Sequence, residues 1–164
     1  MNQNYGVLRE PRIGILLHYD ASVNDRAALA WLRDDPRCKV SYNLLIWDDG
    51  QVHEIAPPSK RAWHAGVCKP SEPRLAYRDA NSAFYGVAIA ATDGDVATPK
   101  QFAAVVAECA RYFLMHDWGR DELWRIVGHD TEAWPRGRKH DPKGSGVVPV
   151  LDVLAVRSAV RASL

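Results

Sequence analysis

The chain has 164 residues, of which 47% are hydrophobic and 25% charged, a composition typical of a folded globular protein and not of a disordered one. Its 21 basic and 20 acidic side chains leave a net charge of +1, without the excess positive charge of most nucleic-acid-binding proteins. No apolar run is long enough to span a bilayer, and three widely spaced cysteines match neither a disulfide framework nor a metal knuckle. We therefore expect one domain, no nucleic-acid partner and no membrane insertion.

The N-terminal elements begin with the apolar run 13–17, which is typical of a buried strand and ends at His18. Charged residues precede this run and no small-residue cleavage site follows it, so it does not resemble a signal peptide. We therefore expect synthesis in the cytoplasm without one. Ser22 or Asn24 is predicted to cap a helix. That helix should end before Pro36, because the residue before a proline disfavours the helical conformation.

Short apolar and turn-forming segments alternate in the middle of the chain. Residues 39–47 (KVSYNLLIW) are predicted to form a strand, and Asp49-Gly50 favours a turn into a second strand over 51–55. Residues 57–78 contain four of the ten prolines, which predicts an ordered, irregular region. A loop of this length in a small domain is usually functional. The apolar run 84–91 (FYGVAIAA) predicts a buried strand.

The clearest helix signal lies at Thr98. Thr98 as N-cap, Pro99 in the first turn and Gln101 three residues after the cap form the pattern of a capping box. Gly119 is predicted to end the helix. The apolar stripe of this helix comprises Phe102, Val105, Val106, Cys109, Tyr112, Phe113 and Met115.

The C-terminal third contains a short predicted strand over 123–127 that leads to His129, then a polar loop over 131–146 and a closing helix over 149–164. The residues expected to dock this helix are Leu151, Leu154, Ala155 and Val160. The order of the elements predicts an α/β fold, a single domain with a mixed central β-sheet flanked by helices.

Two histidines, His18 and His129, come directly after predicted buried strands, and Asp141 follows in the polar loop. Pro142 favours an extended backbone at Asp141, which puts the side chains of Lys139 and Asp141 on one face. Two histidines and a carboxylate are a ligand set of catalytic zinc that leaves a coordination position open for water. Spacing alone does not distinguish such a site from histidines that only serve the core, so both interpretations stay open.

Five sequence blocks occur in the same order as in a known family. They are LHYDAS at 17–22, SYNLLI at 41–46 with Asp49-Gly50, RAWHAG at 61–66, the strand segment 81–89, and VGHD at 127–130 with GRKHDP at 137–142. With these blocks the chain resembles the type 2 N-acetylmuramoyl-L-alanine amidases over residues 13–145. That family includes amidase-type phage lysozymes, bacterial enzymes that process muropeptides, and animal peptidoglycan recognition proteins.

The resemblance implies one Zn²⁺ per chain, held by His18, His129 and Asp141. Lys139 matches the catalytic lysine of the family, and Tyr42 matches the tyrosine that lies near the zinc in the phage lysozymes. In such a site zinc supplies the nucleophilic water. Lys139 would add a fixed positive charge at the developing oxyanion, and Tyr42 would orient the water or relay its proton.

The resemblance also implies a substrate groove at residues 61–66. Trp63, His64 and Ala65 are expected to line it, with the alternative of a core tryptophan and a surface histidine. Asn43 is expected to contact substrate near the metal, with the alternative of an ordinary polar residue of a strand. From its position two residues after His18, Asp20 is expected to fix the loop or orient the site, with the alternative of a competing metal ligand.

One position departs from the family. The muropeptide-processing enzymes carry a catalytic glutamate on the strand that aligns with 86–89, and this sequence has Ala88 there. No carboxylate of that strand can act as the general base, so the chain should resemble the lysozyme-like branch. Tyr42 and Lys139 then provide the polar groups of the reaction.

The expected function is zinc-dependent hydrolysis of the amide bond between N-acetylmuramic acid and L-alanine in peptidoglycan. We expect residues 1–164 to form one catalytic domain without a separate cell-wall-binding domain, and a monomer whose partner is peptidoglycan or a muropeptide. A phage or prophage endolysin that a holin releases to the cell wall is the favoured role. The alternatives are a cytosolic muropeptide-recycling amidase and a non-catalytic peptidoglycan-binding module.

Overall fold

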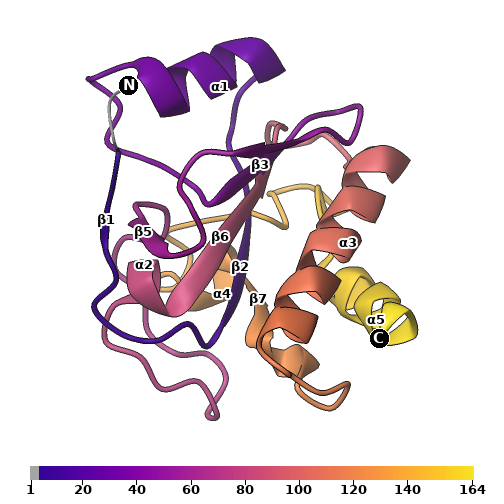
Figure 1. The fold of residues 1–164 in the computed structure, drawn as a ribbon. Helices are drawn as coiled ribbons and strands as arrows, with labels where there is room; N and C mark the ends of the chain where they lie inside the picture. Colours follow the sequence, from indigo (N-terminus) through magenta and orange to yellow (C-terminus); the bar gives the residue numbers. More distant parts are fainter. Residues whose placement is uncertain (1–3) are drawn as a thin grey trace.

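A mixed five-stranded sheet forms the centre of the protein in the computed structural model, which describes residues 4–164. The elements in chain order are β1 (Tyr5–Val7), β2 (Gly14–Tyr19), α1 (Asp25–Asp34), β3 (Leu44–Ile46), β4 (Val52–Glu54), β5 (Lys60–Ala62), α2 (Ala80–Ala83), β6 (Phe84–Ile89), α3 (Pro99–Met115), a 3₁₀ helix (Leu123–Arg125), β7 (Ile126–Gly128), α4 (His129–Glu132) and α5 (Val153–Ser163). Figure 1 shows their arrangement. The predicted α/β fold is confirmed.

The strand order of the central sheet is β4-β3-β6-β2-β7. The four strands from β3 to β7 run parallel, and β4 returns antiparallel to β3 through a turn in which Gly50 has a φ of +85°. In the register of the sheet His18 lies beside Ala88, and Leu17 lies beside Gly128. The carboxyl ends of β2 and β7 therefore meet at one edge, where parallel sheets usually place their ligands.

The face of the sheet toward α3 and α5 carries the largest apolar cluster. Ile15, Leu17, Val87 and other alternate strand residues pack there against buried side chains of α3 and α5, and Figure 1 shows these two helices together on one side of the sheet. The opposite face carries two smaller apolar clusters, one under α1 and one around α2. The polar site described below lies between them.

The helix starts follow the predicted caps. The Asn24 side chain accepts a hydrogen bond from the Ala27 N–H at 2.9 Å and begins α1. Thr98 and Gln101 form both hydrogen bonds of the capping box that begins α3. Each bond satisfies a backbone N–H that the first turn leaves without a helical partner.

The predicted strand over 39–47 is wrong in length, because only 44–46 pair as a strand. Before that point single backbone hydrogen bonds reach other segments: the Ser41 N–H donates to the Trp63 carbonyl, and the Asn43 N–H donates to the Gly86 carbonyl of β6. The region 57–78 is not wholly irregular, because β5 within it pairs antiparallel with β1. Strands of three residues are too short to show a hydrophobic period.

Two helix boundaries also differ from the prediction. Helix α3 ends at Met115, before Gly119, and Met115 is exposed instead of lying on the apolar stripe. Helix α5 begins at Val153 because Asp152 caps it, and this start turns Leu154 toward solvent. The side chains of α5 buried against the sheet are Val156 and Val160.

Candidate metal centre and groove

Three residues from different elements meet at the edge where β2 and β7 end. His18 lies near the end of β2, His129 is the first residue after β7, and Asp141 lies in the loop that follows α4. Their exposed fractions are 1%, 1% and 8%. Each offers one ligand atom, and these atoms all lie within 4.8 Å of one another. The structure thus brings together the three residues predicted to bind metal, among the residues that it describes.

The ligand atoms of this cluster are well defined. Nδ1 of His18 lies 2.7 Å from Oδ2 of Asp141, and Nδ1 of His129 lies 3.0 Å from the same oxygen. Both imidazole rings therefore turn their Nδ1 atoms inward and their Nε2 atoms away from the cluster.

The outer nitrogens determine which atoms are free to bind a cation. Nε2 of His129 lies 2.8 Å from the Ala65 carbonyl oxygen, which can only accept, so Nε2 carries the ring hydrogen. In a neutral ring Nδ1 then has a lone pair, and this lone pair faces the Asp141 carboxylate. Two acceptors in contact are unfavourable unless a proton or a cation lies between them. The donor set therefore fits a divalent metal ion.

The electrostatics of the cluster favour the same protonation states that a metal requires. Burial lowers the pKa of His18 to about 4, against the opposing effect of its hydrogen bond to Asp141. Burial raises the pKa of Asp141, but its contacts with the imidazoles of His129 and His18 outweigh it and hold that pKa well below its usual range. At neutral pH His18 is uncharged and Asp141 is ionised, which are the ligand forms that bind metal.

The loop that carries Asp141 is held by backbone and side-chain bonds. The Asp130 N–H donates to the Asp141 carbonyl at 2.6 Å, and the carboxylate of Asp93 accepts from the N–H and the hydroxyl of Ser145, both at 2.7 Å. Asp93 was not singled out in the sequence, because a clamp between segments 52 residues apart leaves no local pattern.

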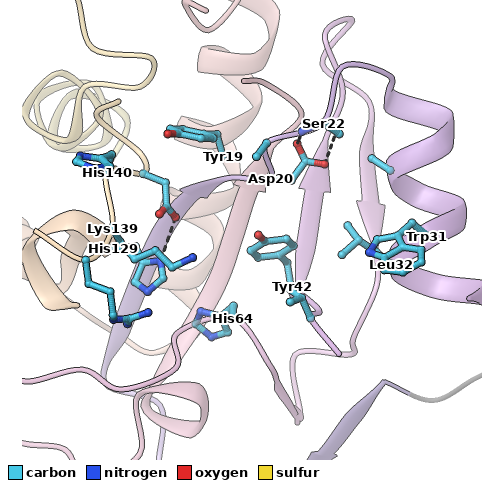
Figure 2. Close-up of a pocket in the computed structure, with 15 residues that line it drawn as sticks. Tyr19, Asp20, Ser22, Trp31, Leu32, Tyr42, His64, His129, Lys139 and His140 are labelled. Carbon is cyan, nitrogen blue, oxygen red and sulfur yellow. Dashed lines mark hydrogen bonds and ion pairs between the residues drawn. The ribbon is translucent and has the colours of Figure 1, made fainter. Parts of the chain in front are cut away.

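The cluster opens into a groove made of two adjoining pockets. The first has a volume of about 420 Å³ and includes Tyr42 and Lys139 in its lining (Figure 2). The second, of about 320 Å³, includes Trp63 and Ala65. Five lining residues belong to both pockets: Val40, His64, His129, Arg138 and Lys139. Six site residues besides the metal ligands were predicted from the sequence. Five of them line this groove: Tyr42, Trp63, His64, Ala65 and Lys139.

Tyr42 lies next to the first histidine. Its ring centroid is 5.2 Å from that of His18, and its hydroxyl points into the first pocket in Figure 2. Burial raises the pKa of Tyr42 far above its ordinary value, and the negative charges of Asp141 and Asp20 add to this effect. The phenol therefore stays protonated at neutral pH and can donate a hydrogen bond.

Asn43 is the predicted site residue that the structure does not bring to the groove. Its side chain is fully buried. Its oxygen accepts from the Gly86 N–H at 3.0 Å, and its amide nitrogen donates to the carbonyls of Ala56 and Pro57, each at 3.2 Å. Its polar atoms thus join β6 to the loop after β4, which accounts for a polar residue in the interior.

Two further placements bear on the chemistry. Ala88 is fully buried beside His18 and packs in the apolar cluster under α1, so β6 offers no carboxylate to the groove. Asp20 accepts from the Ser22 N–H and hydroxyl and from the Ala91 N–H, which fixes the loop after β2 as expected.

No site role was predicted for Trp31. It is 45% exposed and lines the first pocket together with Val40. The buried residues of α1 are Ala28, Leu29 and Leu32, so Trp31 lies at the margin of the apolar stripe.

Comparisons with known protein families and with solved structures agree on one family and one fold. The family model described as N-acetylmuramoyl-L-alanine amidase matches residues 9–144. A structure of AmpD superimposes with a TM-score of 0.74 at 23% identity, covering 96% of this chain and 90% of that one. No curated protein sequence matches the chain, and no helix within residues 4–164 is long and apolar enough to cross a membrane.

Two other solved structures share the fold. The N-acetylmuramyl-L-alanine amidase AmiD from E. coli, solved with the substrate anhydro-N-acetylmuramic acid-L-Ala-D-gamma-Glu-L-Lys, has a TM-score of 0.71 at 20% identity and covers 91% of this chain and 58% of that one. A mutant endolysin from Bacillus subtilis has a TM-score of 0.65 at 19% identity and covers 96% and 91%.

Proposed function

The chain belongs to the N-acetylmuramoyl-L-alanine amidase family, and from that premise we propose that it is a zinc hydrolase whose metal ligands are His18, His129 and Asp141. The observation that carries the proposal is the convergence of three buried ligand atoms within 4.8 Å of one another. The contact between Nε2 of His129 and a carbonyl oxygen adds to it, because that contact leaves Nδ1 as the coordinating atom.

The chemistry of the site follows from the chain's own residues. Zinc bound by these three ligands supplies a Lewis acid and an activated water. Lys139, in the lining of both pockets, contributes a positive charge beside the carbonyl oxygen of the scissile amide as negative charge develops there. The neutral phenol of Tyr42 donates a hydrogen bond that orients the attacking water.

The substrate binds along the two pockets of the groove. We assign the sugar or the peptide stem to the apolar surfaces of Trp31, Val40 and Trp63, and the scissile amide to the pocket wall shared by His129 and Lys139. AmiD, which has the same fold, was solved with an anhydro-muropeptide, which supports a ligand of this class.

We further propose that the protein acts on intact peptidoglycan as an endolysin that a holin releases to the cell wall. The absence of a carboxylate on β6, where Ala88 stands beside His18, supports the lysozyme-like branch over the muropeptide-recycling branch. Residues 1–164 would act as one catalytic domain and as a monomer. Recycling of soluble muropeptides in the cytosol and binding without catalysis are the outcomes that the test must separate.

The test compares two substrates with and without a chelator. Purified protein is incubated with insoluble peptidoglycan and with a soluble anhydro-muropeptide, and newly exposed L-alanine amino groups are measured. Chelator-sensitive release from the polymer supports the endolysin role. Release from the soluble fragment alone supports recycling and contradicts the endolysin role. No release from either substrate by zinc-loaded protein would leave a binding module and overturn the proposed catalysis.

A further inference from the structure

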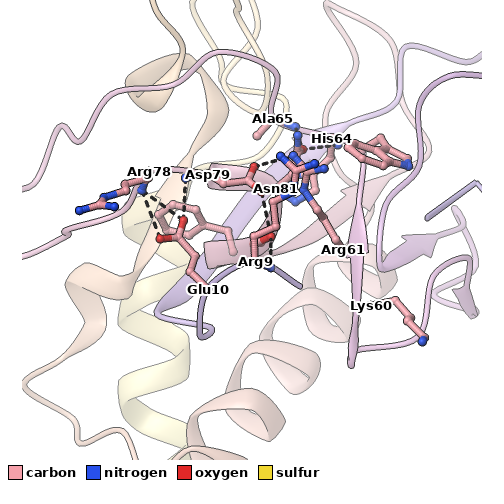
Figure 3. A network of polar contacts seen from close by, with 12 residues as sticks. Arg9, Glu10, Lys60, Arg61, His64, Ala65, Arg78, Asp79 and Asn81 are labelled. Atoms are coloured by element: carbon pink, nitrogen blue, oxygen red, sulfur yellow. Dashed lines mark hydrogen bonds and ion pairs between the residues drawn. The ribbon is translucent and has the colours of Figure 1, made fainter. Parts of the chain in front are cut away.

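Asn81, which lies in α2 outside the ligand set, makes an unusual pair of contacts. Its buried side-chain oxygen accepts two backbone hydrogen bonds, from His64 N–H at 2.9 Å and from Ala65 N–H at 2.8 Å. One side chain thus holds two consecutive residues of the segment after β5. Figure 3 shows Asn81 with the dashed bonds that reach this segment.

The two residues held by Asn81 are the ones that contact the predicted ligands. Nδ1 of His64 lies 3.0 Å from Nε2 of His18, and the carbonyl oxygen of Ala65 lies 2.8 Å from Nε2 of His129. Each ligand histidine therefore has its outer nitrogen bonded to one of two adjacent residues. Such outer contacts set the tautomer and the orientation of a ligating ring.

From this geometry we propose that Asn81 is the positioning residue of the metal centre, acting on both histidine ligands at once. The inference rests on the proposed zinc site. By fixing the peptide step between His64 and Ala65, the Asn81 oxygen fixes the distance between the two partners of the ligand rings. Loss of this oxygen leaves two buried N–H groups without their acceptor and releases both partners together.

The surroundings of Asn81 make it a rigid support. Asp79, two residues earlier, pairs with the Arg61 guanidinium at 2.6 Å, and its N–H donates to the Glu10 carboxylate at 2.6 Å. Arg12 donates to the Asn81 carbonyl at 3.3 Å. Figure 3 shows Asp79 with Arg61 and Glu10 near Asn81. The side chain therefore approaches residues 64 and 65 from a backbone that is bonded on two sides.

The His64 ring has no room to compensate for a shift of its backbone. It packs against β6 at Gly86, where an added Cβ would lie 2.6 Å from the His64 Cγ. Among residues 4–164 its Nε2 has no hydrogen-bond partner although it is buried. An unsatisfied buried group is costly. The polar contact that the His64 ring makes is the one between its Nδ1 and His18, and Asn81 positions this contact.

The experiment measures zinc affinity by competition with a chromophoric chelator, on proteins shown to be folded by circular dichroism. Asn81→Ala should weaken zinc binding about 10- to 100-fold, the range for loss of an outer partner of a metal ligand. Asn81→Asp keeps an acceptor oxygen in the same place and should bind zinc nearly as the wild type does. Ser82→Ala is the matched control, because Ser82 lies next in α2 and contacts Arg9 and Asp79 but neither residue 64 nor 65.

Each outcome decides the proposal. Equal zinc affinity of folded Asn81→Ala and wild type overturns it, as does an equal loss in Ser82→Ala, which would indicate a general effect of loosening α2. Failure of Asn81→Asp to restore affinity also contradicts it. A wild-type protein that binds no zinc refutes the proposed function instead, so the two failures are distinguishable.

A second measurement needs no variant. In metal-free wild-type protein the amide hydrogens of His64 and Ala65 should exchange with solvent as slowly as those of β6, because both donate to a buried oxygen. Rapid exchange at these two amides would show that Asn81 does not hold them before metal binds and would overturn the proposal, even if Asn81→Ala failed to fold.

Discussion

Alternate residues of the same strands build the two faces of the central sheet, and the faces differ in what fills them. In β2, Ile15 and Leu17 point into the apolar cluster under α3 and α5, whereas His18 belongs to the opposite face. In β6, Val87 faces the helices, while Gly86 and Ala88 lie opposite, where their small size leaves space for the histidine rings. One face is closed by apolar packing, and the other is interrupted by a buried polar cluster.

This difference predicts that stability and the proposed metal binding are separable along a strand. Removal of apolar volume from the helix-covered face leaves a cavity in a continuous core. Removal of a ligand from the other face takes away a polar group whose neighbours are other polar groups and the groove. Of two adjacent residues, a substitution on the helix-covered face should therefore lower stability, and a substitution on the other face should lower metal binding and activity.

The largest expected effect comes from His18→Ala, which should abolish stoichiometric zinc binding and hydrolysis while the fold is retained. Its matched variant is Leu17→Ala on the other face, which should cost about 2–5 kcal/mol of unfolding free energy but keep zinc when folded. Metal content and denaturant unfolding measure both. Equal metal content in His18→Ala and wild type would show that His18 is not a metal ligand.

Lys139→Ala tests the charge at the groove. Because Lys139 is expected to contact the oxyanion of the transition state, its loss should lower kcat by roughly 10²- to 10³-fold and raise KM less. Steady-state kinetics on a soluble muropeptide measures this split. An effect confined to KM would instead assign Lys139 to binding of the ground state.

Tyr42→Phe removes one hydroxyl from the wall of the first pocket. The rate should fall on the order of 10²-fold with zinc retained, because the phenol would no longer orient the water. Kinetics and metal content are measured on the same preparation, and the unfolding free energy serves as the control for the buried ring. An unchanged rate would leave Tyr42 as a packing residue of the site face.

The smallest effect concerns acid stability of the polar framework around α2. Burial raises the pKa of Asp79, but hydrogen bonds to Arg61 and Ser82 outweigh it and hold the pKa below its ordinary value. A carboxyl whose pKa is lower in the folded state contributes stability above its unfolded pKa of about 4, and this contribution is lost as pH falls through the folded value. As the pH falls below about 5, the unfolding free energy of metal-free Asp79→Asn should therefore decrease less than that of the metal-free wild type.

The helix-covered face provides the contrast for that measurement. The destabilisation by Leu17→Ala should stay constant over the same pH range, since an apolar side chain does not titrate. Denaturant unfolding at several pH values measures both variants. An identical acid response of Asp79→Asn and wild type would contradict the role assigned to the Arg61–Asp79 pair.

Local signals predicted the parts of the fold whose causes are local. The capping box at Thr98 and the buried run that ends at His18 depend on residues close together in sequence, and the structure places them as expected. The convergence of His18, His129 and Asp141 was implied by the family resemblance, because spacing alone left it open. The apolar runs of β2 and β6 likewise carried enough pattern to be found.

The features that the sequence did not reveal depend on contacts between distant segments. Strands β1 and β5 are three residues each and exist because they pair with one another. The oxygen of Asn81 reaches backbone groups 16 and 17 residues earlier, and no periodicity reports such a bond. The resemblance implied a substrate contact for Asn43, whereas its partners in space are backbone groups of β6 and the loop after β4.

The position of β2 between β6 and β7 has a consequence for how the protein matures. Its pairing partners lie about 70 and 110 residues further along the chain, so β2 cannot pair on both edges until both partners have been synthesised. Pairings of such sequence separation are slow steps in folding. A growing polypeptide on the ribosome has the first histidine early but lacks the second and the carboxylate until its last quarter is made. With the proposed metal site, hydrolytic capacity would arise only when the whole domain has assembled.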